Sequence, residues 1–258
     1  MTGSSWRAVS VPTQKSNGDL PRASGLTASP GRTEARDTAR VLSGAPGRSR
    51  RTDTALIGMH ASTPDDAAYV VGLGDGFTIE MLVWMKTWRP PSTVWLASHG
   101  DISPVTDLDF AFGVESDGKL HLAIGNPAGD TDIGLSSTVS VPFLPGTQGW
   151  IKAVYFQNIF TVGLIQYSTS TTGIAFSALG ADRNLGAAQN PHDSAAGITI
   201  PSETPSEDVL IFSANIFYGG TTAVASPQFS TLSPGTTSFR DDPRKQWTVN
   251  SPGLIGVV

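Results

Sequence analysis

The sequence contains no cysteine, few charged residues and no long hydrophobic run. Without cysteine, a disulfide framework and a thiolate zinc site are both excluded, and the redox compartment stays open. No window approaches the roughly 20 consecutive apolar residues of a membrane span, and the N-terminus lacks the apolar core of a signal peptide. We therefore expect a soluble protein that has no membrane partner and does not leave a cell by an ordinary signal peptide.

Glycine and proline are frequent in the sequence, with 28 and 18 residues among 258, whereas charged residues make up only 15%. Short apolar runs alternate with Ser- and Thr-rich stretches, and no segment shows a persuasive long helical period. This texture is typical of many short strands joined by turns, so it predicts an all-β protein.

Residues 1–52 differ from the rest of the chain in charge. They carry nine Lys and Arg residues against three acidic residues, a net charge of +6, so the remainder carries −11. Their Ser-, Gly- and Pro-rich sequence cannot bury a core, which predicts an extended N-terminal arm. Three interpretations stay open: a disordered linker, a segment that orders on a partner surface, and a nucleic-acid tail suggested by "RSRR". For the second, the arginines that would pair with a partner's carboxylates are Arg7, Arg22, Arg32, Arg36, Arg40, Arg48, Arg50 and Arg51.

The stretch "DGFTIEMLVWMKTW", residues 75–88, alternates with period two. Successive side chains of a strand point to opposite faces of a sheet, so the alternation predicts a half-buried strand. Its core face would carry Phe77, Ile79, Met81 and Val83, and its other face Thr78, Glu80, Leu82 and Trp84.

Further strands are predicted in pairs along the chain. "LDFAFGVESDGKLHLAIG", residues 108–125, is a hairpin whose turn uses Asp117-Gly118, because glycine accepts the positive φ of a tight turn. The same alternation predicts a second pair, residues 149–158 with residues 161–168, and a late strand over residues 208–220.

Taken in order, "DGFTIEMLVWMK", "WLASHGD", "FAFGVESDGKLHLAIG", "GWIKAVYFQN" and "TVGLIQYSTSTTG" resemble the laminin-G-like branch of the concanavalin A-like jelly rolls. The final stretch resembles the closing segment of laminin-G-like minor tail proteins from phages of actinobacteria. The matching positions are Phe229, Pro234, Gly235, Thr236, Phe239, Asp241, Trp247, Thr248 and Val249. The resemblance implies a two-sheet antiparallel jelly-roll sandwich over residues 53–258, with residues 228–258 as its closing segment, and a strand around Trp247 that pairs with early strands.

Catalytic motifs are absent from the sequence. Retaining glycosidases need two carboxylates about 5.5 Å apart, which on a strand means acids at i and i+2 or i+4. The pairs Asp107/Asp109 and Asp130/Asp132 have this spacing but lie in loop-like sequence without a third acid. There is no G-x-S-x-G element and no phosphate loop. His99, in "SHGD", is interpreted as a surface-loop histidine. We expect a protein that is not an enzyme and needs no organic cofactor.

Two kinds of binding residue remain as candidates. Laminin-G-like domains often bind calcium at the sheet rim, which makes Asp101, Asp107 and Asp109 calcium candidates, with solvated loop acids as the alternative. Exposed aromatic side chains stack on sugar rings, so Trp84, Trp88 and Trp95 are candidates for carbohydrate contact; the alternative is that some of them are buried in the core.

The resemblance implies a structural or adhesion component of a tailed-phage virion, assembled in the host cytoplasm: a minor tail, tail-fibre or baseplate protein. A capsid-surface decoration protein and a carbohydrate-binding, lectin-like module are the alternatives. The expected partners are other virion proteins, contacted through the arm, and a host surface glycan rather than nucleic acid. Virion proteins commonly form symmetric homo-oligomers, so we expect several copies in each particle.

Overall fold

The computed structural model describes the body of the chain. The described residues are 54–57, 60–70, 76–102, 105, 107–128, 132–157, 163–186, 191–202, 208–233, 236–250 and 255–257. The arm predicted for residues 1–52, with its arginines, lies outside them, as do Pro234 and Gly235 of the closing segment.

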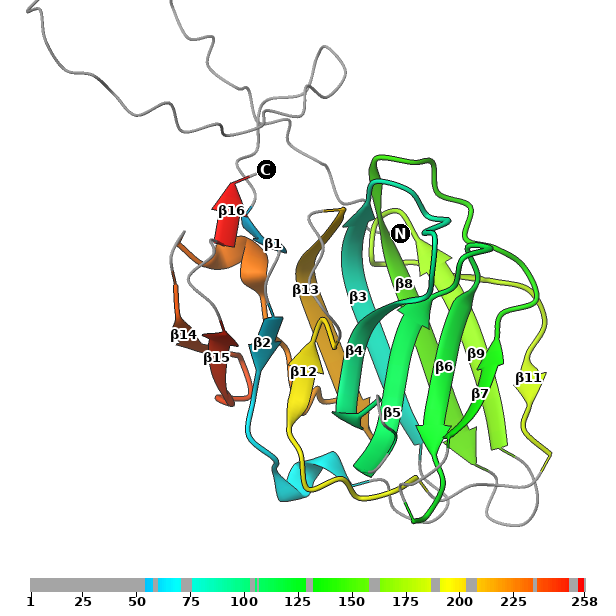
Figure 1. The fold of residues 1–258 in the computed structure, drawn as a ribbon, viewed down its shortest axis with the longest axis horizontal. Helices are drawn as coiled ribbons and strands as arrows, with labels where there is room; N and C mark the ends of the chain where they lie inside the picture. Colours follow the sequence, from blue (N-terminus) through cyan, green and yellow to red (C-terminus); the bar gives the residue numbers. More distant parts are fainter. Residues whose placement is uncertain are drawn as a thin grey trace, which may run out of the picture. The chain divides into compact units, whose positions relative to one another are not determined.

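Two antiparallel β-sheets account for the regular structure of these residues (Figure 1). Sheet A contains, in spatial order, β10 (Ser177–Ala178), β9 (Gly163–Ser170), β8 (Thr147–Gln157), β3 (Gly76–Met85), β13 (Val209–Tyr218), β1 (Thr54–Ile57) and β16 (Ile255–Val257), and β11 (Arg183–Asn184) also pairs with β9. Sheet B contains β14 (Ser238–Arg240), β15 (Gln246–Asn250), β2 (His60–Ser62), β12 (Ile198–Ile200), β4 (Val94–Asp101), β5 (Asp107–Val114), β6 (Leu120–Gly125) and β7 (Asp132–Ser136). Two short 3-10 helices complete the described structure: η1 (Ala67–Tyr69) and η2 (Phe229–Thr231).

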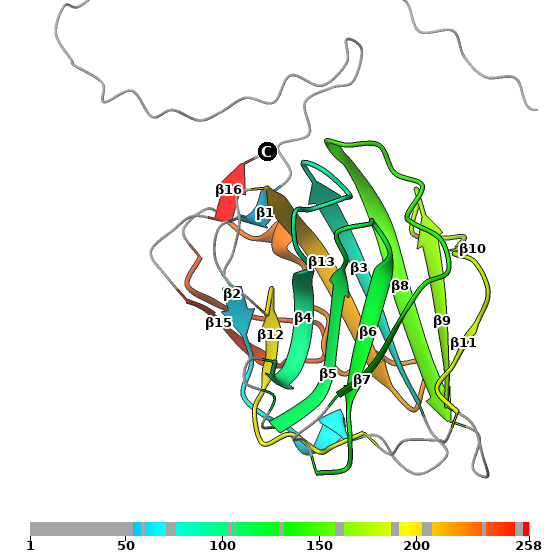
Figure 2. The same cartoon turned by 45° about the vertical axis from the view of Figure 1, so that its right-hand side comes forward.

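The sheets lie face to face as two layers. Figures 1 and 2 both show β4, β5 and β6 in front of β3, β8 and β9. This is the two-sheet antiparallel jelly-roll sandwich, so the predicted fold class is confirmed. No helix in the described part of the chain has the length and apolar character needed to cross a membrane.

Strand β3 shows how the sequence pattern builds the sandwich. Phe77, Ile79, Met81 and Val83 are at most 2% exposed, and the residues between them are partly exposed, as the alternation predicts. The strand pairs with β8 along its whole length and with β13 on its other side. Burying a large apolar side chain contributes about 1.5–3 kcal/mol, so this one face stabilises the fold substantially.

The predicted hairpins are also confirmed. Strands β5 and β6 pair around a turn in which the Gly118 N–H donates to the Glu115 carbonyl at 2.9 Å, and Gly118 has φ +83°. Strands β8 and β9 pair from Trp150 opposite Ser170 to Gln157 opposite Gly163.

Aromatic side chains from both sheets meet in the core. Phe77 of sheet A stacks on Phe110 of sheet B with ring centroids 5.2 Å apart, and it also contacts Tyr155 and Tyr218. Because aromatic pairs add stabilisation beyond their buried area, this group ties the two layers together.

The first and last strands of the described chain pair with each other in both sheets. Strand β1 pairs with β16 in sheet A, and β2 pairs with β15 in sheet B. The prediction that the strand around Trp247 pairs with an early strand is therefore confirmed.

Candidate functional site

The outer face of sheet A, which points away from the core, carries aromatic and charged side chains together. On β3, Glu80, Leu82 and Trp84 are partly exposed because they alternate with the core residues. The register with β8 places Lys152, Trp150 and Gln148, respectively, directly opposite them. Directly opposed residues of an antiparallel pair lie on the same face, so these six side chains are neighbours. Beside them on the same face, Leu82 and Trp84 pack against Ala55, Leu210 and Phe212.

One ion pair stands among these aromatic groups. The Lys152 ammonium donates to the Glu80 carboxylate at 2.8 Å, and the two side chains are 25% and 18% exposed. The same ammonium lies 5.1 Å from the centroid of the Phe176 ring, within cation–π range. We call Glu80, Leu82, Trp84, Trp150, Lys152 and Phe176 the aromatic face.

The turn after β9 lies over Trp150. Gly173 has φ +76°, and a Cβ at this position would lie 2.6 Å from the Trp150 indole. Only glycine allows both the positive φ and the close approach. The neighbouring Ile174 is 91% exposed, so a large apolar side chain stands in solvent beside this face.

The structure separates the three tryptophans that the sequence suggested for carbohydrate contact. Trp84 belongs to the aromatic face. Trp88 is 3% exposed, packs on Phe143 and donates its indole N–H to the Thr147 carbonyl at 3.1 Å, so it is part of the core and cannot contact a sugar. Trp95 lies on the outer face of sheet B, where its ring meets His121 edge-on at 5.5 Å.

The sequence reasoning missed Trp150, although a signal for it was present. Ile151, Ala153 and Tyr155 alternate into the core of β8, which by itself places Trp150 and Lys152 on the outer face.

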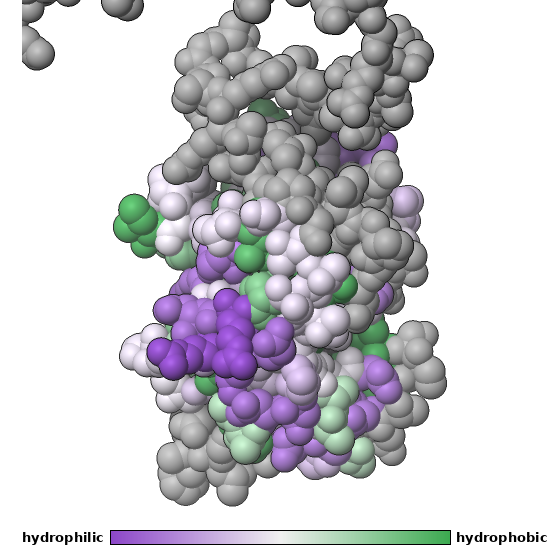
Figure 3. All heavy atoms as spheres, turned by 90° about the vertical axis from the view of Figure 1, so that its left-hand side faces the viewer, coloured by the Kyte–Doolittle hydropathy of each residue, from purple (hydrophilic) through white to green (hydrophobic). Residues whose placement is uncertain are grey.

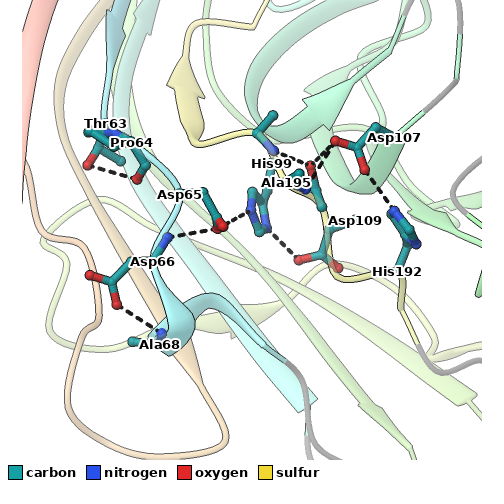
Figure 4. Close-up of polar contacts among 12 residues, drawn as sticks. Thr63, Pro64, Asp65, Asp66, Ala68, His99, Asp107, Asp109, His192 and Ala195 are labelled. Atoms are coloured by element: carbon teal, nitrogen blue, oxygen red, sulfur yellow. Dashed lines mark hydrogen bonds and ion pairs between the residues drawn. The ribbon is translucent and has the colours of Figure 1, made fainter.

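A buried polar cluster lies between the sheets around His99. The His99 side chain is fully buried on β4, and its Nδ1 is 2.8 Å from the Asp109 carboxylate. The Tyr218 hydroxyl donates to the same carboxylate at 2.7 Å. On the other side of the ring, His99 Nε2 lies 3.7 Å from the carboxylate of Asp65 (Figure 4).

A β-bulge accounts for the inward position of Asp109. His99 pairs with Phe110 and Gly100 with Leu108, so Asp109 is the extra residue between two paired positions. A bulge re-aims the side chains near it. The interpretation of His99 as a surface-loop residue was therefore wrong, because "SHGD" forms the end of a buried strand.

Burial and ion pairing set the protonation of this cluster. Burial by itself lowers the pKa of His99, but the hydrogen bond and charge of Asp109 outweigh it, so the pKa of His99 is raised. Burial also raises the pKa of Asp109, and it raises the pKa of Tyr218 well above 10. Tyr218 is thus a neutral donor, and His99 can bind a proton but cannot reach a substrate, because its side chain is 0% exposed.

Two of the three calcium candidates, Asp101 and Asp107, are opposite each other where β4 pairs with β5, but the third, Asp109, points into the core. Asp109 is committed to His99, whereas Asp107 accepts hydrogen bonds from His192 at 2.7 Å and from Ser194 at 3.0 Å (Figure 4). Asp101 lies at the exposed end of β4. In the described ranges, no group of three or more histidine, cysteine or acidic side chains is placed to hold a metal ion.

The closing segment contributes β14 and β15 to sheet B and β16 to sheet A, and its aromatic side chains pack together. The Phe239 and Trp247 rings lie 6.2 Å apart and nearly parallel, and Phe229 meets Phe239 edge-on at 5.8 Å. The Trp247 indole N–H donates to Asp241 at 3.0 Å, and the same carboxyl group accepts the Ser226 N–H at 2.8 Å. The hairpin β14–β15 also has exposed charged side chains, and Figure 3 shows hydrophilic side chains gathered on this side of the molecule.

The fold and these surfaces define a two-sheet jelly-roll module. No family model matches the sequence, and no curated protein matches it. Among solved structures, the chain is similar to the binding domain of botulinum neurotoxin serotype D, at 8% identity and TM-score 0.42, over 67% of this chain and 39% of that one. The chain thus spans about two fifths of the length of that neurotoxin chain.

Two other solved structures are similar at a comparable level. One is an SAP-like pentraxin from Limulus polyphemus, at 16% identity and TM-score 0.35, over 64% of this chain and 78% of that one. The other is the CBM40 of a Ruminococcus gnavus IT-sialidase bound to α2,3-sialyllactose, at 12% identity and TM-score 0.39, over 66% of this chain and 92% of that one.

Proposed function

We propose that the chain is a non-enzymatic recognition module of a tailed-phage virion, carried at the tail as a minor tail, tail-fibre or baseplate protein. The observation that carries this proposal is the packed closing segment. Phe229, Phe239, Asp241 and Trp247 are positions at which the sequence resembles minor tail proteins, and they contact one another in a single unit. A resemblance whose residues interlock supports a shared structural element better than scattered matches would.

The aromatic face supports recognition as the task of the module. Partly exposed tryptophan, leucine and phenylalanine side chains on one sheet face are typical of binding surfaces. The His99 and Asp109 side chains are buried, and the two acids at catalytic spacing on one described strand, Asp107 and Asp109, are each bonded to a histidine. Binding therefore accounts for the described surface better than catalysis does.

The attachment of the module is part of the same proposal. The arm, residues 1–52, would dock on other virion proteins through its arginines and place several copies on each particle. A capsid-surface decoration protein with the same arm is the second candidate for location, since an arm and a displayed domain suit either position.

Immunogold labelling tests the location directly. Purified particles of the phage that encodes the chain would be labelled with antibodies raised against the full chain, with a particle lacking the gene as the control. We expect gold at the tail. Gold over the capsid would favour the decoration protein, and particles that carry no label would contradict the virion role.

A further inference from the structure

We propose that the aromatic face binds an uncharged carbohydrate, with a sugar ring lying on Trp84 and Trp150 and sugar hydroxyls bonding to Glu80 and Lys152. The inference deepens the proposed function, since it names the ligand class that the recognition module would take.

The arrangement of the two indoles supplies the stacking surface. Trp150 lies opposite Leu82, and Trp84 lies two residues further along the same face of β3. Diagonal neighbours on a sheet face are about 7–8 Å apart, within reach of large side chains and of one ligand. Both indoles remain partly exposed. Trp84 packs beside Leu210 and Phe212 on the same face, and the turn at Gly173 packs against Trp150, so both rings are held in place and leave part of their surface open to a ligand.

The charges on this face select among ligand classes. Glu80 and Lys152 pair with each other, and at the end of β3 Lys86 pairs with Asp208 at 2.9 Å. The pairs cancel, so the face offers no excess positive charge of the kind that phosphate groups require. A neutral ligand is the complementary partner.

The ion pair also argues against a purely apolar ligand. A lipid chain or an apolar protein surface would desolvate Glu80 and Lys152 without giving them new hydrogen bonds, which is costly. A carboxylate accepts several hydrogen bonds and an ammonium donates three, so both groups keep capacity beyond their mutual bond. Sugar hydroxyls donate and accept, and they lie beside the apolar C–H face of the ring, which matches the mixture of groups here. The exposed side chain of Gln148, opposite Trp84, adds an amide that can also donate and accept hydrogen bonds.

The experiment uses the full chain and an array of neutral, amino and acidic glycans, followed by titration of the best-bound glycan in solution. We expect a neutral glycan to bind. Trp84→Ala and Trp150→Ala should each weaken it at least tenfold, and Lys152→Met should weaken it less. Trp95→Ala is the matched control, because this tryptophan is partly exposed on the outer face of the other sheet, and it should leave affinity unchanged.

Folding and ligand contact must be separated in this test, because Trp84 packs on Leu210 and Phe212. Trp84→Phe and Trp150→Phe keep an aromatic ring and should retain more affinity than the alanine variants, and circular dichroism verifies the fold of each protein. Lack of binding by the wild type, binding only to acidic glycans, or an equal loss in Trp95→Ala would each overturn the inference. The proposed virion role fails separately, when labelled particles carry no copies although the glycan still binds.

Discussion

The contribution of Trp247 to stability is open to a direct measurement. Its side chain is 0% exposed, it stacks on Phe239, and its N–H donates to Asp241 at 3.0 Å. Truncation of a buried aromatic residue to alanine costs about 3–5 kcal/mol through lost burial and the cavity left behind. The lost hydrogen bond is a smaller part, about 1 kcal/mol, because Asp241 keeps its bond from Ser226.

Urea unfolding of the full chain, followed by circular dichroism, would measure these terms. Trp247→Ala should lower the free energy of unfolding by about 3–5 kcal/mol. Trp247→Phe retains a stacking ring but cannot donate to Asp241, so its loss should be smaller. If the alanine variant loses less than about 1 kcal/mol, Trp247 is peripheral and the closing segment is not part of the cooperative unit.

Three further predictions address the buried cluster, the calcium candidates and the arm. Because the pKa of folded His99 is raised, its contribution to stability is fully present below about pH 6.5 and is lost as the pH rises through the folded pKa. His99→Gln should remove this pH dependence from the free energy of unfolding measured across the pH range. If the free energy of unfolding of the variant depends on pH as that of the wild type does, His99 is not its source. Since Asp107 and Asp109 are committed to histidines, melting curves with chelator and with millimolar calcium should coincide, and a higher melting temperature with calcium would restore the metal site. Deletion of residues 1–52 should leave the β-type circular dichroism spectrum unchanged but abolish incorporation into particles, whereas incorporation at normal copy number would place the attachment surface on the jelly roll.

The long strands were predictable because the pattern that identifies them lies within a few consecutive residues. In β3, β8 and the β5–β6 hairpin, one face is buried and the other is not, so period-two alternation appears directly in the sequence. The same alternation is sufficient to place Glu80 and Trp84 outside the core, where the fold has them.

The cluster at His99 was not predictable in this way. Alternation assumes an unbroken register, and the bulge breaks it at Asp109: Phe110 and Phe112 face the core as predicted, but Asp109 also points inward. The third member, Tyr218, comes from the other sheet, so only the packing of the two layers brings its hydroxyl to Asp109. Trp88 was ambiguous for a related reason: it lies beyond the end of β3, where no periodicity indicates its direction.

The pairing of β1 with β16 and of β2 with β15 has a consequence for synthesis on the ribosome. The earliest strands of the described chain emerge long before their partners, so their outer edges stay unpaired while the middle of the sandwich is being made. A chain interrupted before Gln246 would lack both closing strands and would present open sheet edges, which favour aggregation. Only copies translated through β15 and β16 can pair the outer edges of β1 and β2, so the order of synthesis separates finished modules from unfinished ones.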